Sequence, residues 1–322
     1  MNRTPLISIV IAAHNRERLL PITLRSVQEQ TCRDWECVIV DDKSTDQSLS
    51  VANRWARDDN RFRAVASERK AGASVTRNRG FAEINPASTF VTFMDCDDVW
   101  LPDALSTLLN AAEASPAMAG AHGLADFIDE EGSPMLPGKF ATFGRERIGL
   151  GENGTLQEWD RSKPTSFNTL LVKNTVFPPG VVLTRRVFFE KTGLFDPAMG
   201  LVEDWDMILR LSRYGSFAFV NQVVIQYRRH QGSISLQSHD ANIRKVRAFQ
   251  YKSFLSPENT PEQKVIARKT WRQLQLKAMR VKWETVRKRA TAGNYLGAGA
   301  MLARIYVEIH RFLRGYPTPR GL

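Results

Sequence analysis

Alternating carboxylates at Asp95 and Asp97 are the residues whose types and spacing most directly suggest chemistry. They follow an apolar run over residues 90–94, which is typical of a buried strand ending at the open edge of an α/β sheet. A hard divalent cation prefers oxygen ligands and is usually held by one or two protein carboxylates together with substrate phosphates. The spacing therefore predicts a Mg²⁺ or Mn²⁺ site at this strand end. The alternative is a solvated turn capping the helix that begins near Pro102, an interpretation that suits Asp98.

Strands and helices alternate through the N-terminal part of the chain, an order that predicts βαβ units and a largely parallel sheet. Ligands on such sheets bind at the carboxyl ends of the strands. Three expected strands end in polar groups, at residues 14–15, 41–42 and 95–97, so these groups are predicted to converge on one edge. The expected strands cover residues 6–13, 35–40, 62–66 and 90–94; Asn15 and Ser44 are expected to cap the first two helices, and a third helix spans 73–84.

The alternating pattern loosens after Ala121. Residues 130–180 are rich in glycine, proline and polar residues, and we expect an inserted loop region with little regular structure. A strand over 181–183, a helix opening at Glu203 and a strand over 217–227 are predicted to follow.

Length and composition bound the class of protein. The chain has 322 residues and a hydrophobic content of 43%, enough for a sizeable core in one large domain with an appendage, or in two domains. No apolar run approaches the roughly 20 residues that span a bilayer. The N-terminus runs straight into a strand pattern, so no signal peptide is expected. The three cysteines are scattered, which favours a reducing compartment and neither a zinc site nor a disulfide framework.

The net charge of +11 is unevenly distributed. Residues 241–322 hold 18 lysines and arginines against 4 acidic residues, whereas residues 1–240 hold 27 against 30. We therefore expect a near-neutral α/β domain over 1–240 and a basic α-helical region over 241–322. Trp271 and Trp283 among the basic residues suit a helix lying on an anionic membrane surface. Two alternatives stay open: helices packed on the domain with a solvated charged face, and nucleic-acid binding, for which the sequence has no motif.

Six short motifs follow one another in order, at residues 7–16, 41–46, 72–80, 94–98, 203–206 and 227–233. Their order and spacing resemble those of the family-2 glycosyltransferases. The resemblance implies the GT-A fold, a Rossmann-like, mostly parallel sheet flanked by helices. It also implies an inverting, metal-dependent transfer of one sugar from a nucleotide sugar to a hydroxyl of a glycan, glycolipid or other glycoconjugate. The expected setting is cell-surface polysaccharide synthesis by a cytoplasmic enzyme, peripheral at the inner face of the cell membrane.

The resemblance assigns the metal site to residues of the fourth and sixth motifs. It makes Asp97 the main protein ligand of a Mn²⁺ or Mg²⁺ ion and brings Asp95 to the ribose or the metal shell. His230 is expected to ligate the metal or to hydrogen-bond the diphosphate. The alternative for His230 is a loop histidine stacked on Tyr227. A cation here acts as a Lewis acid on the diphosphate and stabilises the departing negative charge.

The resemblance also implies a binding site for the nucleotide sugar. Asp42 is expected to read the base, because a carboxylate accepts the imino N–H of uracil; its alternative role is to stabilise the start of the next helix. A UDP-linked donor is expected, and thymine, which shares that N–H, and guanine, which offers a similar edge, stay open as alternatives. Arg77, a planar cation with several donors, is expected to bind phosphate or the base. The remaining predicted contacts to the donor are Ala12, His14, Asp95 and Ser233.

Asp204, with Glu203 beside it, is the expected general base, which must lie within hydrogen-bond reach of the acceptor hydroxyl. An ordinary carboxylate has a low pKa for this role, and the charge of Glu203 is expected to raise the pKa of Asp204. The alternative is that both acids only stabilise the first turn of their helix through its dipole. Inversion at the anomeric carbon is implied by the resemblance alone.

Three positions depart from the family's pattern. Residues 12–14 are Ala-Ala-His where Pro-Thr-Tyr or Pro-Ala-Tyr is usual, a change that bears on the base pocket. Lys70 replaces a common asparagine and adds a charge near the donor. Lys43 replaces a frequent glycine, so we expect a less relaxed turn. None of the three removes a carboxylate from the predicted site.

Two other functions compete with this prediction. A non-catalytic module that binds a nucleotide sugar or a partner on the same fold is disfavoured by intact Asp95, Asp97 and Asp204. A nucleotidyltransferase is expected to show a glycine-rich phosphate loop after the first strand, and residues 12–15 contain no glycine. The Gln-x-x-Arg-Trp pattern of processive relatives is absent, since residues 226–230 end in histidine, and single-sugar transfer is expected.

Overall fold

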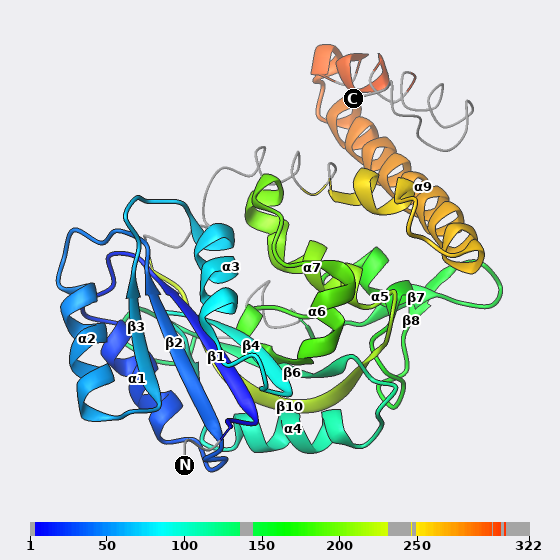
Figure 1. The fold of residues 1–322 in the computed structure, drawn as a ribbon. Helices are drawn as coiled ribbons and strands as arrows, with labels where there is room; N and C mark the ends of the chain where they lie inside the picture. The colour runs from blue at the N-terminus through cyan, green and yellow to red at the C-terminus, as the bar shows by residue number, and fades with distance from the viewer. Residues whose placement is uncertain are drawn as a thin grey trace.

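An eight-stranded sheet forms the centre of the protein in the computed structural model, which describes residues 4–135, 144–230, 246, 249–297, 299–303 and 306 (Figure 1). The strand order is β3-β2-β1-β4-β9-β6-β10-β5, and β7 and β8 form a separate antiparallel hairpin. The strands are β1 (Ile7–Ala13), β2 (Trp35–Asp41), β3 (Phe62–Ala66), β4 (Phe90–Asp95), β5 (Val99–Trp100), β6 (Gly120–Ile128), β7 (Ile148–Leu150), β8 (Leu156–Glu158), β9 (Val182–Arg185) and β10 (Phe217–Arg228).

The sheet is mostly parallel, as predicted. Strands β3, β2, β1 and β4 run parallel to one another, and β6 runs parallel to β10. Strands β9 and β5 pair antiparallel to theirs. The continuous apolar runs of β1, β2 and β4 are buried, as expected for parallel strands covered on both faces.

Strand β1 lies between β2 and β4, and this position brings the polar strand ends together. Ala12 is paired with Val40 on one side and with Asp95 on the other. The carboxyl ends of the three strands are therefore adjacent, and the predicted convergence of polar groups on one edge is confirmed.

Helices cover both faces of this sheet. Figure 1 shows α4 below the sheet and α3, α6 and α7 above it. A Cβ atom on Gly80 of α3 would lie only 2.3 Å from Cγ1 of Val10, so glycine lets this helix approach β1 closely. The α-helices are α1 (Leu20–Gln28), α2 (Ser48–Asp58), α3 (Ala73–Glu83), α4 (Ala104–Glu113), α5 (Phe167–Val172), α6 (Arg186–Thr192), α7 (Glu203–Leu211) and α9 (Pro261–Thr291); η1 (Pro179–Val181) and η2 (Pro197–Val202) are 3₁₀ turns.

The predicted caps of the first two helices were wrong. α1 begins at Leu20 and α2 at Ser48, beyond Asn15 and Ser44. The Asn15 side chain instead accepts the Thr45 N–H at 2.8 Å, and the Ser44 hydroxyl accepts the Asn15 N–H at 3.0 Å. These polar side chains join the loops after β1 and β2 to each other. Hydrogen bonds between residues so far apart in the sequence cannot be predicted from the local sequence pattern.

The prediction of little regular structure over residues 130–180 was also partly wrong. Its described residues form β7, β8, α5 and η1. The backbone is organised around Arg147, whose buried guanidinium donates to the carbonyls of Asp160 at 3.0 Å and Lys163 at 2.7 Å. The segment is held together by hydrogen bonds from Arg147 to backbone carbonyls. Such bonds produce no hydrophobic periodicity, so the sequence pattern could not predict this structure.

The C-terminal part packs on the α/β body before it extends away from it. Phe249 and Phe254, in a helical segment at 249–255, are buried in the same core as the sheet. Ala267 and Thr270 of α9 are buried as well, and α9 contacts α5 and β7. The packing alternative therefore holds for the first half of α9, whereas the division at residue 240 stays a prediction.

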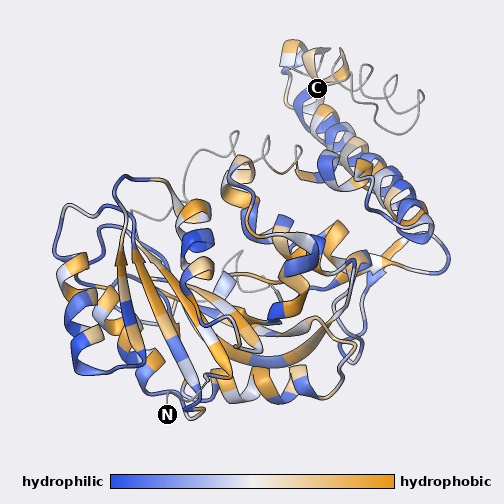
Figure 2. Cartoon of the chain, in the orientation of Figure 1, coloured by the Kyte–Doolittle hydropathy of each residue, from blue (hydrophilic) through white to orange (hydrophobic). Residues whose placement is uncertain are grey.

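The second half of α9 has a different surface. Figure 2 shows the helix as largely hydrophilic, in contrast to the apolar strands of the sheet. Trp283 is exposed there. No helix among the described residues has the length and apolarity to cross a membrane.

Candidate active site

Asp97 lies at the strand-end edge and is held by two nitrogen donors. His230 Nε2 is 2.9 Å and Arg16 Nε 3.3 Å from the same oxygen, Oδ2. Burial raises the pKa of Asp97, but the hydrogen bond with His230 and the charge of Arg16 outweigh it, so that the pKa is lowered overall. Asp97 is therefore an anionic group that attracts positive charge at this point of the site.

The neighbouring Asp98 is not a solvated cap, and that interpretation was wrong. Its side chain is fully buried, and Oδ1 accepts the backbone N–H of Arg228 at 3.0 Å. Burial, followed by the charges of Asp97 and Asp95, raises the pKa of Asp98 well above its usual range. Arg228 also donates from Nε to the carbonyl of Asp97 at 3.0 Å. Asp98 and Arg228 thus fix the backbone of the turn that presents Asp97.

Arg77 of α3 joins the strand-end carboxylates to the start of α7. Its Nη2 lies 2.5 Å from Asp95 Oδ1, and its Nη1 lies 3.0 Å from Glu203 Oε1. The guanidinium is buried, with 5% of the side chain exposed. Burial lowers the pKa of Arg77, but the charges of Asp95 and Glu203 raise it by more. The predicted role in binding phosphate or base stays a prediction; in this structure both terminal nitrogens contact carboxylates.

Asp204 is buried in the first turn of α7, next to Glu203. Its Oδ1 accepts the backbone N–H of Trp205 at 2.6 Å. Burial, and then the charge of Glu203, raises the pKa of Asp204 to about 7. Trp205 anchors this turn through its Nε1, which donates to the carbonyl of Leu170 at 2.6 Å. A carboxylate whose proton affinity matches neutral pH is suited to accept a proton.

The other end of the edge is organised by Asp42. Its two carboxylate oxygens accept the backbone N–H groups of Ala71 and Gly72, each at 2.8 Å. His14 Nδ1 lies 2.9 Å from the Asp42 carbonyl oxygen. The assignment of Asp42 to the base stays a prediction, and its carboxylate holds the loop before α3. That loop borders a cavity of about 300 Å³ lined by Ser67, Glu68, Arg69, Ala71, Val75, Thr76 and Arg79.

Lys43 adopts a φ of +59°, in the left-handed region. This is the position where glycine is frequent in the family's pattern, and a β-carbon there costs about 1–2 kcal/mol. The unrelaxed turn expected from the sequence is therefore present.

The donor types at the strand end fit a hard or borderline divalent cation. Carboxylate oxygens of Asp95 and Asp97, with the imidazole of His230, suit Mg²⁺ or Mn²⁺. The convergence of Arg16 and His230 on one Asp97 oxygen marks where positive charge is favoured. Within the described parts of the chain, however, no three His, Cys, Asp or Glu side chains are grouped as a bound metal would group them.

Three side chains with clear roles at the site were missed by sequence reasoning. Arg16 and Arg228 bind the Asp97 region, and Asn78 exchanges hydrogen bonds of 2.8 and 3.0 Å with the backbone of Phe195. All three lie inside the motifs that were recognised, which was the available signal. Ser233, a predicted donor contact, lies outside the described residues.

Comparison with protein-family models and solved structures agrees with this architecture. The model described as "Glycosyl transferase family 2" matches residues 8–193. The mannosyltransferase PcManGT from Pyrobaculum calidifontis, in complex with GDP-Man and Mn²⁺, superposes with a TM-score of 0.60 at 19% identity, over 94% of this chain and 80% of that one. Residues 1–349 of Staphylococcus aureus TarS, in complex with UDP-GlcNAc, give a TM-score of 0.59 at 15% identity, over 83% and 72%. At these identities the likeness shows the fold.

Curated relatives are similar over parts of their length. The GalNAc(5)-diNAcBac-PP-undecaprenol β-1,3-glucosyltransferase of Campylobacter jejuni is 33% identical over 144 residues, which is 44% of each chain. Glycosyltransferase GlyG of Streptococcus pneumoniae is 24% identical over 73% of this chain and 74% of its own. The chain spans less than half the length of several of these relatives, including the Campylobacter enzyme.

Proposed function

The chain belongs to glycosyl transferase family 2, and on this premise we propose that it transfers one sugar from a UDP-linked donor to a hydroxyl of a lipid-linked or other glycan acceptor. The observation that carries the proposal is the connected cluster of carboxylates around Arg77. Asp95 stands at the donor edge and Glu203 at the start of α7, and one buried guanidinium contacts both. Asp204, with its raised pKa, is the next residue.

The proposed reaction is a single displacement. Asp204 takes the proton of the acceptor hydroxyl as its oxygen attacks the anomeric carbon, and the bond from that carbon to the diphosphate oxygen breaks. The new glycosidic bond forms as the nucleoside diphosphate leaves. Burial of Asp204 and its position beside Glu203 support this role, because both disfavour the charged form until neutral pH is reached. Inversion at the anomeric carbon is part of this proposal and rests on the resemblance to the family.

A divalent cation is part of the proposal. Mn²⁺ or Mg²⁺ would be held by Asp97, with Asp95 and His230 contributing, and would supply charge stabilisation for the departing diphosphate. The Mn²⁺ complex of the Pyrobaculum enzyme supports this on the same fold. The protein's own part is to keep Asp97 anionic and its turn fixed, through His230, Arg228 and Asp98.

The donor base is tested by titration calorimetry with UDP, GDP and dTDP, each with and without Mn²⁺. We expect tight, metal-dependent binding of UDP. Asp97→Asn should weaken UDP binding in Mn²⁺ at least about 10-fold, since a metal ligand is lost, and should leave the weak metal-free binding unchanged. Asp58→Asn, an exposed carboxylate of α2, is the control and should bind as the wild type.

Two outcomes would contradict the proposal. Equal UDP affinity in Asp97→Asn and the wild type, with Mn²⁺ present, would remove Asp97 from the metal site. Failure of the folded wild type to bind any of the three nucleotides would favour the non-catalytic module on the same fold.

The acceptor is proposed to be lipid-linked and reached from an anionic membrane surface. Helix α9 carries ten lysines and arginines and two glutamates. Trp283, Tyr295 and Leu296 are exposed on it or just after it, and such residues insert at a membrane interface. The name of the Campylobacter relative, which includes an undecaprenol-linked glycan, supports this acceptor class.

Membrane binding is tested by replacing Arg287 and Lys288 of α9 with glutamine together. Each basic residue near an anionic surface contributes about 1 kcal/mol, so binding to phosphatidylglycerol vesicles should fall at least about 10-fold. Co-sedimentation at two salt concentrations measures it, and the wild type should lose binding at high salt. The matched control replaces Arg54 and Arg57, which are exposed on α2. Equal pelleting of all three proteins would leave α9 as a solvated helix.

A further inference from the structure

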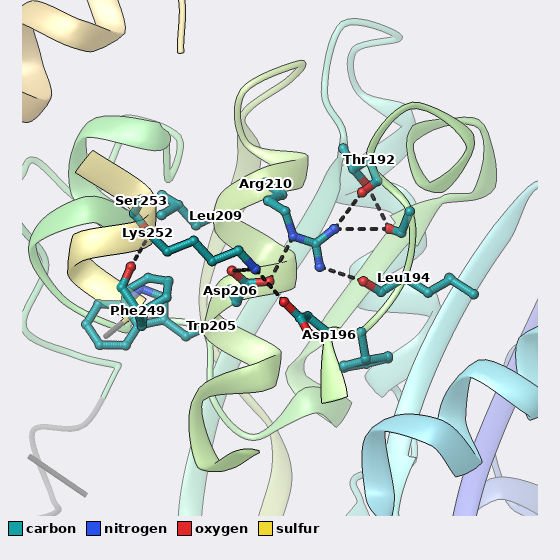
Figure 3. A network of polar contacts seen from close by, with 12 residues as sticks. Thr192, Leu194, Asp196, Trp205, Asp206, Leu209, Arg210, Phe249, Lys252 and Ser253 are labelled. Carbon is teal, nitrogen blue, oxygen red and sulfur yellow. Dashed lines mark hydrogen bonds and ion pairs between the residues drawn. The ribbon is translucent and has the colours of Figure 1, made fainter. Parts of the chain in front are cut away.

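A buried carboxylate in the first turn of α7 is paired with a lysine from the C-terminal part of the chain. Asp206 is nearly fully buried, with 3% of its side chain exposed. Its Oδ1 lies 2.9 Å from Lys252 Nζ, and the same ammonium lies 2.8 Å from Asp196 Oδ2 (Figure 3). Lys252 therefore joins two acidic residues that flank η2, the turn leading into α7.

Arg210 completes the environment of this carboxylate. Its Nε donates to Asp206 Oδ2 at 2.8 Å, and its Nη atoms donate to the carbonyls of Thr192 at 2.6 Å and Leu194 at 2.5 Å. Arg210 thus links α7 to the loop after α6. The two cations bind different oxygens of Asp206, so neither replaces the other geometrically.

An aromatic contact on the same face reinforces the pairing. Phe249 is fully buried and packs on Trp205, with ring centroids 4.3 Å apart. Residues 249 and 252 lie three positions apart in the helical segment, which places both on one face. Figure 3 shows this face turned toward Trp205 and Asp206. One helical turn of the C-terminal part therefore contacts two consecutive residues of α7, Trp205 and Asp206.

We propose that Lys252 is a positioning residue for the acceptor-side carboxylates, acting through Asp206 on the turn that carries Glu203 and Asp204. Residues 203–206 form a single helical turn, so a constraint on Asp206 sets where Asp204 stands. Misplacement of a reacting group by about 1 Å can cost about 100-fold in rate. The inference rests on the proposed function of Asp204 and extends it to a residue beyond the recognised motifs.

The test compares Lys252→Met, Lys252→Arg and the control Lys264→Met, an exposed lysine of α9. Lys252 is 38% exposed, so methionine fills its place without opening a buried cavity. We expect kcat of Lys252→Met to fall about 10- to 100-fold, with the donor KM within about twofold. Lys252→Arg should recover most of the loss, because a cation is restored, and Lys264→Met should match the wild type.

Hydrogen exchange of the α7 amides gives a second readout that needs no substrate. Lys252→Met should lose protection in residues 207–210, whose N–H groups bond to the carbonyls of residues 203–206, and keep it in α3. An unchanged kcat in a folded Lys252→Met protein would overturn the proposal, as would equal loss of kcat in the arginine variant. If the wild type turns over no donor, the proposed function fails separately; unaltered protection of α7 in Lys252→Met would then reject the positioning role.

Discussion

Replacing Asp204 with asparagine is expected to lower kcat about 10³-fold, within the range that general-base removal costs, while nucleotide affinity stays within about twofold. Asparagine keeps the oxygen that accepts the Trp205 N–H, so the turn is preserved, but it cannot take a proton from the acceptor. Steady-state kinetics with calorimetry on the same preparation separates the two effects. Retained turnover in this variant would reject Asp204 as the base.

The pH dependence provides a control for the same assignment. Since the pKa of Asp204 is raised to about 7, wild-type kcat should rise with pH through that value and then level. Between the usual Asp value of 3.8 and about 7, the unfolded chain releases a proton that the folded state keeps, so the wild type loses stability as pH rises. Asp204→Asn lacks this loss, and its unfolding free energy relative to the wild type should increase over the same window. If the difference in unfolding free energy between the variant and the wild type does not change between pH 3.8 and about 7, Asp204 is not the buried titrating group.

Replacing Arg77 with methionine is expected to lower the free energy of unfolding by about 3–5 kcal/mol, because two carboxylates are left beside a buried site without their cation. Asp95 and Glu203 would face each other unpaired, at 2.5 and 3.0 Å from where the guanidinium nitrogens stood. Urea denaturation at pH 7.5 measures the loss.

Arg63→Met is the matched control for this prediction. Arg63 pairs with Glu83 at 3.3 Å, but both side chains are more than a third exposed, so its removal should cost under about 1 kcal/mol. Arg77→Lys should fall between the two, since an ammonium restores charge but cannot reach both carboxylates with a planar fork. An Arg77→Met protein as stable as the Arg63 variant would show that the pair contributes no net stability.

Much of the α/β core follows directly from local pattern. The apolar runs before residues 14, 41 and 95 predicted the strands, and parallel pairing then placed their ends together. The carboxylates were found because strand ends and short acidic motifs are both local signals. The helix caps were predicted wrongly, because the side chains of Asn15 and Ser44 form hydrogen bonds between the loops after β1 and β2, across about thirty residues, and do not cap helices.

The contacts that complete the site are long-range, and no periodicity encodes them. Arg77 meets Glu203 across 126 positions, and His230 meets Asp97 across 133. Lys252 contacts Asp206 of α7, but it lies in a C-terminal region for which the sequence predicted only a basic net charge. Charge composition describes a surface on average, whereas the position of one ammonium beside Asp206 depends on how the segment at 249–255 folds back.

The contacts of Phe249 and Lys252 with α7 have a consequence for protein engineering. A chimera that joins the N-terminal part of one relative to the C-terminal part of another must keep the contact of residues 249 and 252 with α7 intact. A splice at residue 240 would pair Trp205 and Asp206 of one parent with residues 249 and 252 of the other, and so mix the two halves of a single contact. A chimera that takes residues 150–274 from one parent inherits both halves, together with the hydrogen bond from Gln273 Nε2 to the Gly154 carbonyl and the packing of Leu274 on the core.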